Sequence, residues 1–241
     1  SESTNRSRIN IEAEIIGNKT NPNRLEIEDE VKIEAIDESS ADTSSIGAAV
    51  SVSGSGGGAG ALSIGVSLGR NFINNRVQST LKNLTDQSKV GSLSITAGKT
   101  KNSSSTKNFE AFSQSTAVSL AVSKTGLAVS GGGGDSLNVA NGDTKTNIEN
   151  VSLTSEKGIN INSTNNQLAK ADVGFTGVSG TGVGAAIAIG VVNVQNLLGV
   201  EDKDSNSRAQ VKTHVVDSTL VSNNGIITIE SNSESKYEAS A

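Results

Sequence analysis

The chain has 241 residues, a net charge of −5, and no Cys, Met or Trp. The missing cysteines exclude a disulfide scaffold and a thiolate metal site, and no block of basic residues suggests nucleic-acid binding. Aromatic residues make up only 2% of the chain, so a core must be built from Val, Ile, Leu, Ala and Gly, which suits thin layers. The apolar stretch 183–194 is too short for a transmembrane helix, which needs about 20 residues.

Period-two alternation of apolar and polar residues predicts β-strands, because successive side chains of a strand point to opposite faces. A polar, weakly apolar chain can also be disordered, but sustained alternation favours an ordered β structure. In chain order, the predicted strands lie at 25–34, 48–53, 61–68, 76–81, 91–95, 117–123, 145–148, 158–162, 183–189, 208–215 and 225–229. Helical spacing is not sustained in any segment.

An internal repeat organises the chain. Gly91, Gly158 and Gly225 are evenly spaced, and each begins a short alternating strand. The same spacing separates Leu81, Ile148 and Val215. It predicts one continuous domain over 1–241, with a partial unit at 1–24, repeats at about 25–91, 92–158 and 159–225, and a trailing strand at 226–241. Both ends of the sequence are polar, and we therefore expect it to be a piece of a longer chain.

The predicted fold is all-β, a parallel β-helix (β-solenoid) built from 67-residue repeats. A coil of about 20 residues would give about three coils per repeat and a rod about 50 Å long, since neighbouring strands lie about 4.8 Å apart. Val, Ile and Leu are expected to point inward, and Ser, Thr and Asn outward. The alternative is an antiparallel β-sandwich or a set of immunoglobulin-like modules, which normally bury a large aromatic residue in each module.

The titratable residues do not form a recognisable catalytic motif, and we expect no enzyme activity. His214 is the only histidine and is predicted to be an outward-facing strand residue. A cluster of carboxylates alternates with apolar residues and is predicted to lie on the solvated side of strands; it consists of Glu26, Glu28, Asp29, Glu30 and Glu34.

A calcium ion is the only cofactor for which the sequence offers ligands. Asp202, Asp204 and Asn206 match the opening of an EF-type loop, whose oxygen ligands suit Ca²⁺. The match ends there, because Ser207 stands where the loop needs Gly and Thr213 where it needs Glu. The surrounding segment 197–206 is otherwise predicted to be a projecting hydrophilic loop.

Several blocks resemble repeats of giant bacterial surface proteins of the filamentous-haemagglutinin and large-adhesin class. They are Gly47-Ala-Ala-Val-Ser-Val-Ser-Gly-Ser-Gly56, Ala61-Leu-Ser-Ile-Gly-Val-Ser-Leu68, Asn74-Asn-Arg-Val77 and Ser92-Leu-Ser-Ile-Thr-Ala97. The resemblance implies an exported protein at the bacterial cell surface that serves adhesion, filament building or surface coating. This chain would then be a rod-like spacer, an adhesin stalk or a filament-building unit. Its expected partners are neighbouring repeats, homotypic filament contacts and surface glycans.

Two other functions remain open at this stage. One is a carbohydrate-active β-helix enzyme, which would need a groove lined by clustered carboxylates. The other is a self-assembling sheath or S-layer-like filament subunit, in which exposed end coils pair by strand addition.

Overall fold

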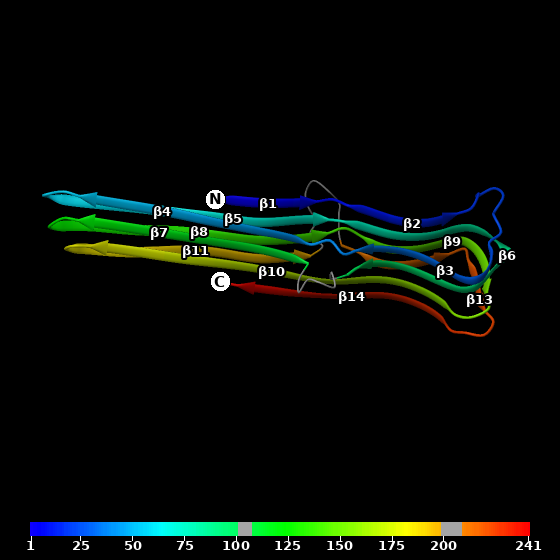
Figure 1. Cartoon of the computed structure of the whole chain (residues 1–241). Helices are drawn as coiled ribbons and strands as arrows, with labels where there is room; N and C mark the ends of the chain where they lie inside the picture. Colours follow the sequence, from blue (N-terminus) through cyan, green and yellow to red (C-terminus); the bar gives the residue numbers. More distant parts are fainter. Residues whose placement is uncertain (101–107, 199–208) are drawn as a thin grey trace.

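The computed structural model describes residues 1–100, 108–198 and 209–241. These residues form long strands that run side by side along an elongated molecule (Figure 1). The strands are β1 (Glu2–Ser7), β2 (Asn10–Ile16), β3 (Glu26–Asp37), β4 (Ala41–Gly54), β5 (Gly58–Asn74), β6 (Arg76–Lys99), β7 (Phe109–Val122), β8 (Thr125–Asn141), β9 (Thr144–Ser155), β10 (Ile159–Thr181), β11 (Gly184–Leu198), β12 (Val211–Val216), β13 (Thr219–Ser222) and β14 (Ile227–Ser240).

Every strand pair in the described residues is parallel, and the strands form two sheets. Sheet A has the order β1-β5-β8-β11. Sheet B has the path β12-β9-β6-β10-β7-β4, with β13, β14, β2 and β3 attached to it. It curls, because one half of β6 pairs with β2 and β9 and the other half with β3 and β10. The prediction of an all-β parallel architecture is confirmed, and the antiparallel sandwich is wrong.

Paired residues lie far apart in the sequence. Val77 pairs with Thr144 and Gly58 with Thr125, both at the spacing that separates Gly91 from Gly158. The separation is smaller between β7 and β10, where Phe109 pairs with Ala169, and between β8 and β11, where Gly126 pairs with Gly184. A strand therefore pairs with the strand that lies about one sequence repeat further along the chain, so one repeat forms one long coil. The prediction of three short coils per repeat is wrong. The long axis of the molecule accordingly follows the strands, not the stacking direction (Figure 1).

The main apolar core lies in the part that we call the base, which comprises β2, β3, β6, β9, β12, β13 and the first halves of β10 and β14. Its strands alternate as expected, with aliphatic side chains inward and polar ones outward. Leu81 on β6 and Ile148 on β9 are adjacent in register and completely buried. The buried core residues are Val31, Ile33, Leu81, Leu84, Val90, Leu93, Ile95, Ile148, Val151, Leu153, Ile159 and Ile161.

The strands of the base bend at three residues in left-handed conformation. Asn83, Asn150 and Asp217 have φ values of 57°, 53° and 48°. Asn and Asp adopt this conformation more readily than other non-glycine residues. Asn150 Nδ2 also donates to Oδ1 of Asn83 at 3.1 Å, so the bends of adjacent layers are joined.

Next to the base, the interior contains a cluster of buried polar residues that we call the waist. Lys99 is buried there, and its Nζ donates to the carbonyl oxygens of Gly142 at 2.8 Å and Asn141 at 3.3 Å. Asn75 Nδ2 donates to the buried carboxylate of Asp37 at 2.8 Å. Burial lowers the pKa of Lys99 to about 8, although the carboxylates of Asp37 and Asp143 act in the opposite direction.

The buried lysine predicts a stability that rises with pH. Between pH 8 and the ordinary lysine pKa of 10.5, the unfolded chain binds a proton at Lys99 that the folded chain has lost. The free energy of unfolding should therefore increase over this interval, by about 3 kcal/mol in total. Urea unfolding of the wild type and of Lys99→Met at pH 7.5 and pH 10 measures this increase. The other lysines are the same in both proteins, so their contribution cancels when the two pH dependences are compared. Equal pH dependences of the free energy of unfolding would contradict the prediction.

Candidate functional site

The other half of the molecule is a flat double layer that we call the blade, at left in Figure 1. It consists of residues 43–69, 111–134 and 173–198, which belong to β4, β5, β7, β8, β10 and β11. The outer rows of sheet B join Val50, Val118 and Val178 through the strand register. The outer rows of sheet A include Leu62, Val129 and Ile187.

Aliphatic side chains of the blade point to solvent, which is the reverse of the base. Val50 is 72% exposed, Ile64 62% and Val191 70%. The expectation that Val, Ile and Leu point inward is therefore correct for the base and wrong for the blade. The exposed large aliphatic residues of the blade are Ile46, Val50, Val52, Leu62, Ile64, Val66, Leu120, Val122, Leu127, Val178, Val183, Ile187, Ile189, Val191 and Val192.

The interior of the blade is filled mostly with Ser, Ala and Gly, because its two sheets approach each other closely. The larger side chains of Val173 and Phe175 enter it only opposite Gly134, Gly132 and Gly190. A Cβ on Gly47 would stand 2.4 Å from the carbonyl oxygen of Val66, and one on Gly69 would stand 2.6 Å from that of Phe112. Such contacts require the backbone to move apart. The close approach of the sheets therefore assigns the small residues to the inside and the branched aliphatic residues to the outside.

Serine hydroxyls add polarity to this interior. Ser179 Oγ donates to Ser130 Oγ at 2.7 Å. Just outside the blade, Ser136 Oγ donates to the carbonyl oxygen of Asp172 at 2.6 Å. Among the described residues, other buried hydroxyls have no hydrogen-bond partner; they include those of Ser63, Ser67, Ser113, Ser115 and Ser119. A buried polar group without a partner costs about 1–3 kcal/mol, so the blade gains less from its interior than the base does.

A ladder of asparagines joins the two sheets next to the waist. Nδ2 of Asn71 donates to Oδ1 of Asn138 at 2.8 Å, and Nδ2 of Asn138 donates to Oδ1 of Asn196 at 2.8 Å. Each amide also reaches across to sheet B, since Asn71 donates to the carbonyl oxygen of Glu110 and Asn138 to that of Lys170, both at 2.7 Å. The ladder thus fixes the separation of the sheets where the blade begins.

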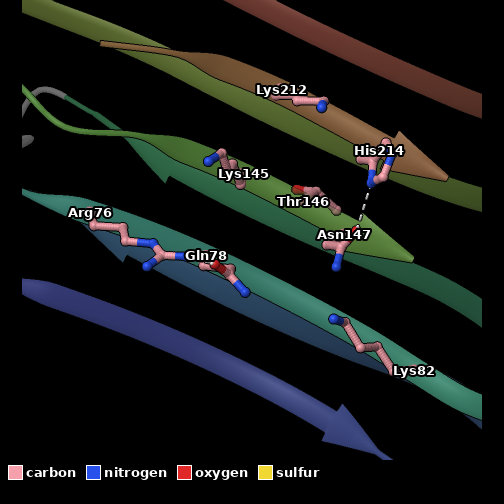
Figure 2. A pocket seen from close by; sticks show the side chains of 8 residues that line it. All are labelled: Arg76, Gln78, Lys82, Lys145, Thr146, Asn147, Lys212 and His214. Atoms are coloured by element: carbon pink, nitrogen blue, oxygen red, sulfur yellow. Dashed lines mark hydrogen bonds between the residues drawn. The ribbon is translucent and has the colours of Figure 1, made fainter. Parts of the chain in front are cut away.

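A second surface feature is a shallow hollow of about 300 Å³ on the outer side of the base (Figure 2). It is lined by Arg76, Gln78, Lys82, Lys145, Thr146, Asn147, Lys212 and His214. Two of its lysines already bind carboxylates, because Lys82 Nζ lies 2.8 Å from Glu149 and Lys145 Nζ lies 2.8 Å from Asp143. The hydrogen bond from Lys82 lowers the pKa of Glu149. These ion pairs reduce the positive charge available to a ligand.

The structure places His214 and the carboxylates of 26–34 on the surface. His214 is exposed on β12, and its Nδ1 lies 3.1 Å from Oδ1 of Asn147 (Figure 2). The carboxylates of 26–34 are exposed, as expected, and two of them pair with neighbours close in sequence, Glu26 with Arg24 and Glu34 with Lys32. The described residues contain no group of three or more His, Cys, Asp or Glu side chains that could hold a metal ion.

The predicted calcium ligands Asp202, Asp204 and Asn206 lie outside the described residues. Asp135, which follows the glycine run 131–134, lies within the described residues. Its carboxylate accepts hydrogen bonds from Nε of Arg70 at 2.8 Å and from Nδ2 of Asn193 at 2.7 Å.

The sequence interpretation missed the blade, although one signal for it is visible. Residues 43–69 and 173–198 contain no charged residue, and 111–134 contain only Lys124. Charged side chains are mostly exposed and are common on the solvent side of a strand. Segments in which apolar and small polar residues alternate, but which contain almost no charged residue, therefore indicate strands whose outer face is more apolar than an ordinary solvent-facing strand.

In the described part of the chain, no helix is long and apolar enough to cross a membrane. No family matches the sequence, and no curated protein or solved structure matches it either.

Proposed function

We propose that this chain is a structural and adhesive segment of a secreted or cell-surface bacterial protein, and that the blade is its interaction surface. In this proposal the chain is a β-solenoid in which one coil corresponds to one sequence repeat and adds one strand to every layer. The stack serves as the spacer or stalk, and the blade makes the contacts.

One observation carries the proposal, namely that both outer faces of the blade are aliphatic. The largest apolar patch on an ordinary monomer measures about 300–600 Å² and is itself often functional. Here exposed aliphatic residues continue over two faces and involve six strands. Their exposure is imposed by the close approach of Gly47 and Gly69 to the opposite backbone, so they cannot turn inward.

The resemblance to large bacterial adhesins agrees with this proposal. The carbohydrate-active alternative has less support, because two of the exposed carboxylates of β3 pair with the nearby cations Arg24 and Lys32. The filament alternative is compatible with the exposed aliphatic faces of the blade.

A matched pair of triple variants tests the proposal. Ile46, Ile64 and Ile189 are exposed on the blade, and Ile16, Ile27 and Ile229 are exposed on the base. Replacing the blade set with Thr should lower adsorption to a hydrophobic surface by at least about tenfold, because each change removes apolar area from the contact. Replacing the base set with Thr should leave adsorption close to that of the wild type.

Adsorption can be followed by the mass bound to an alkyl-coated quartz microbalance. Equal losses in both triple variants would contradict the assignment of the blade. Release of reducing ends from a panel of polysaccharides would contradict a non-catalytic role.

A further inference from the structure

The hollow on the outer side of the base differs in charge from the chain around it (Figure 2). Four of its eight lining residues are cationic, namely Arg76, Lys82, Lys145 and Lys212, and none of the eight is acidic. The whole chain carries a net charge of −5. The residues that line the hollow therefore have the opposite sign of charge to the chain as a whole.

The strand register brings these cations together from three neighbouring strands. Lys145 on β9 pairs with Gln78 on β6 and with Lys212 on β12. Neighbouring strands lie about 4.8 Å apart, and like charges directly opposite each other destabilise a sheet. Figure 2 shows that the two ammonium groups point apart along their strands. The pairing of strands therefore gives no reason for two lysines at these positions.

Two of the four cations are not neutralised within the described residues. Arg76 donates to the neutral Oε1 of Gln78 at 2.5 Å and forms no ion pair with a described carboxylate. Lys212 also forms no ion pair with a described carboxylate, and its side chain is exposed. A guanidinium has five N–H donors and an ammonium has three. Both side chains therefore keep donors and a full positive charge for a ligand.

The other two cations are engaged but remain able to bind. Lys82 pairs with Glu149 and Lys145 pairs with Asp143, and all four side chains are partly exposed. Exposed ion pairs contribute little to stability, because water competes for both partners. Lys145 can also donate to Asp143 and to a ligand at the same time, since an ammonium has three donors. These ion pairs therefore do not close the hollow to an anion.

Two further carboxylates lie beside the hollow, on β2. Glu12 of β2 pairs in register with Gln78 of β6, and Glu14 lies two residues further along β2. Both carboxylates therefore stand across β6 from Lys145 and Lys212. On the opposite side of the hollow, β12 contains no acidic residue. An anion that approaches over β12 meets cations first.

We infer that the hollow binds an oxyanion group, a sulfate or a carboxylate, that is carried by an acidic polysaccharide. Arg76, Lys145 and Lys212 are the donors to this group. Hydrogen bonds from Arg and Lys to such anions are about twice as strong as those between neutral groups. The site lies on the base, so it does not depend on the role proposed for the blade.

A nucleic acid fits the hollow less well than a polysaccharide. Single strands are bound by aromatic side chains on which the bases stack, and the eight lining residues include no Phe, Tyr or Trp. A polysaccharide presents hydroxyl groups next to its acidic groups. The side-chain amides of Gln78 and Asn147, which also line the hollow, are suitable hydrogen-bond partners for hydroxyls.

Binding of the wild type to immobilised dextran sulfate and polygalacturonate, measured by surface plasmon resonance with neutral dextran as the reference, tests the inference. Arg76→Gln combined with Lys212→Gln should weaken binding to the tighter-bound acidic polymer at least about tenfold, because two charge-assisted contacts are lost. Both side chains are exposed, so the fold should be retained, and circular dichroism verifies this. Binding should also weaken as NaCl is raised, because salt screens exposed charges.

Arg24→Gln combined with Lys157→Gln is the matched control. It removes the same two charges from exposed positions that do not line the hollow, and it should change the affinity by less than about twofold. Equal weakening in the two double variants would show that net charge alone governs binding, and would overturn the inference. The inference is also wrong if neither acidic polymer binds more tightly than neutral dextran.

A single-stranded DNA oligonucleotide separates the two kinds of polyanion. Weaker binding of the oligonucleotide than of the preferred acidic polysaccharide supports the inference, and equal or tighter binding overturns it. The triple variant of the blade keeps the hollow intact, so its affinity for the acidic polymer should equal that of the wild type. A failure of the role proposed for the blade and a failure of this site therefore give different results.

Discussion

Asn138→Ala is expected to lower the free energy of unfolding by about 1–3 kcal/mol, because it removes one member of the ladder and the three hydrogen bonds that this member makes. Asn138 is 1% exposed. Its amide donates to the carbonyl oxygen of Lys170 and to Asn196, and its Oδ1 accepts from Asn71. The substitution removes these three hydrogen bonds and creates a small cavity, while Asn71 Nδ2 still donates to the carbonyl oxygens of Glu110 and Ala41.

The measurement is the urea midpoint, compared with that of Asn160→Ala. Asn160 is exposed on β10, where the same change should alter stability by less than about 0.5 kcal/mol. Similar midpoints for the two variants would show that the ladder does not hold the sheets together.

Ile148→Ala and Ile64→Ala should differ sharply, although both remove the same atoms from the middle of a strand. Ile148 is fully buried in the core of the base, whereas Ile64 is 62% exposed on the blade. The first change should cost about 2–5 kcal/mol through lost burial and a cavity. The second should change stability by no more than about 0.5 kcal/mol.

Thermal or urea unfolding at low protein concentration measures this difference, since dilution removes contacts between copies. If Ile64→Ala destabilises the dilute protein as much as Ile148→Ala, the blade packs its aliphatic residues inside, and the assignment of its faces is wrong.

The base was largely predictable from the sequence. Its strands alternate aliphatic and polar residues, and the aliphatic side chains of Ile33, Ile95 and Ile161 are buried as expected. Gly158 and Gly225 stand just before β10 and β14, as predicted, whereas Gly91 lies inside β6 and does not begin a strand.

The orientation of the blade was not predictable by the same reasoning. Alternation shows that a strand has two different faces, but it does not show which face is buried. The face with Val is usually buried and the face with Ser exposed, and the blade is an exception. The deciding fact is the distance between the sheets, and that distance depends on the glycines of one sheet meeting the backbone of the other. The three nearly charge-free segments were the available signal.

Coil length was also misjudged, for a related reason. Strands in most proteins have roughly 3–10 residues, which suggested short coils. Here β6 has 24 residues and β10 has 23. Asn71 and Asn138 stand at the same spacing as the repeated glycines, so alignment of the units would have matched these two members of the ladder. Asn196 lies only 58 residues after Asn138 and would have been missed.

The register around the waist has a consequence for how such a chain can change in length. From Lys99 to Phe109 the chain takes ten steps, whereas the paired stretch from Asn165 to Ala169 takes four, yet pairing is regular on both sides. Extra residues at this point leave every strand in place, so the waist is a natural insertion point for foreign peptides or tags. One residue added within a strand would instead turn each following side chain to the opposite face, exchanging the aliphatic exterior of the blade with its serine-lined interior.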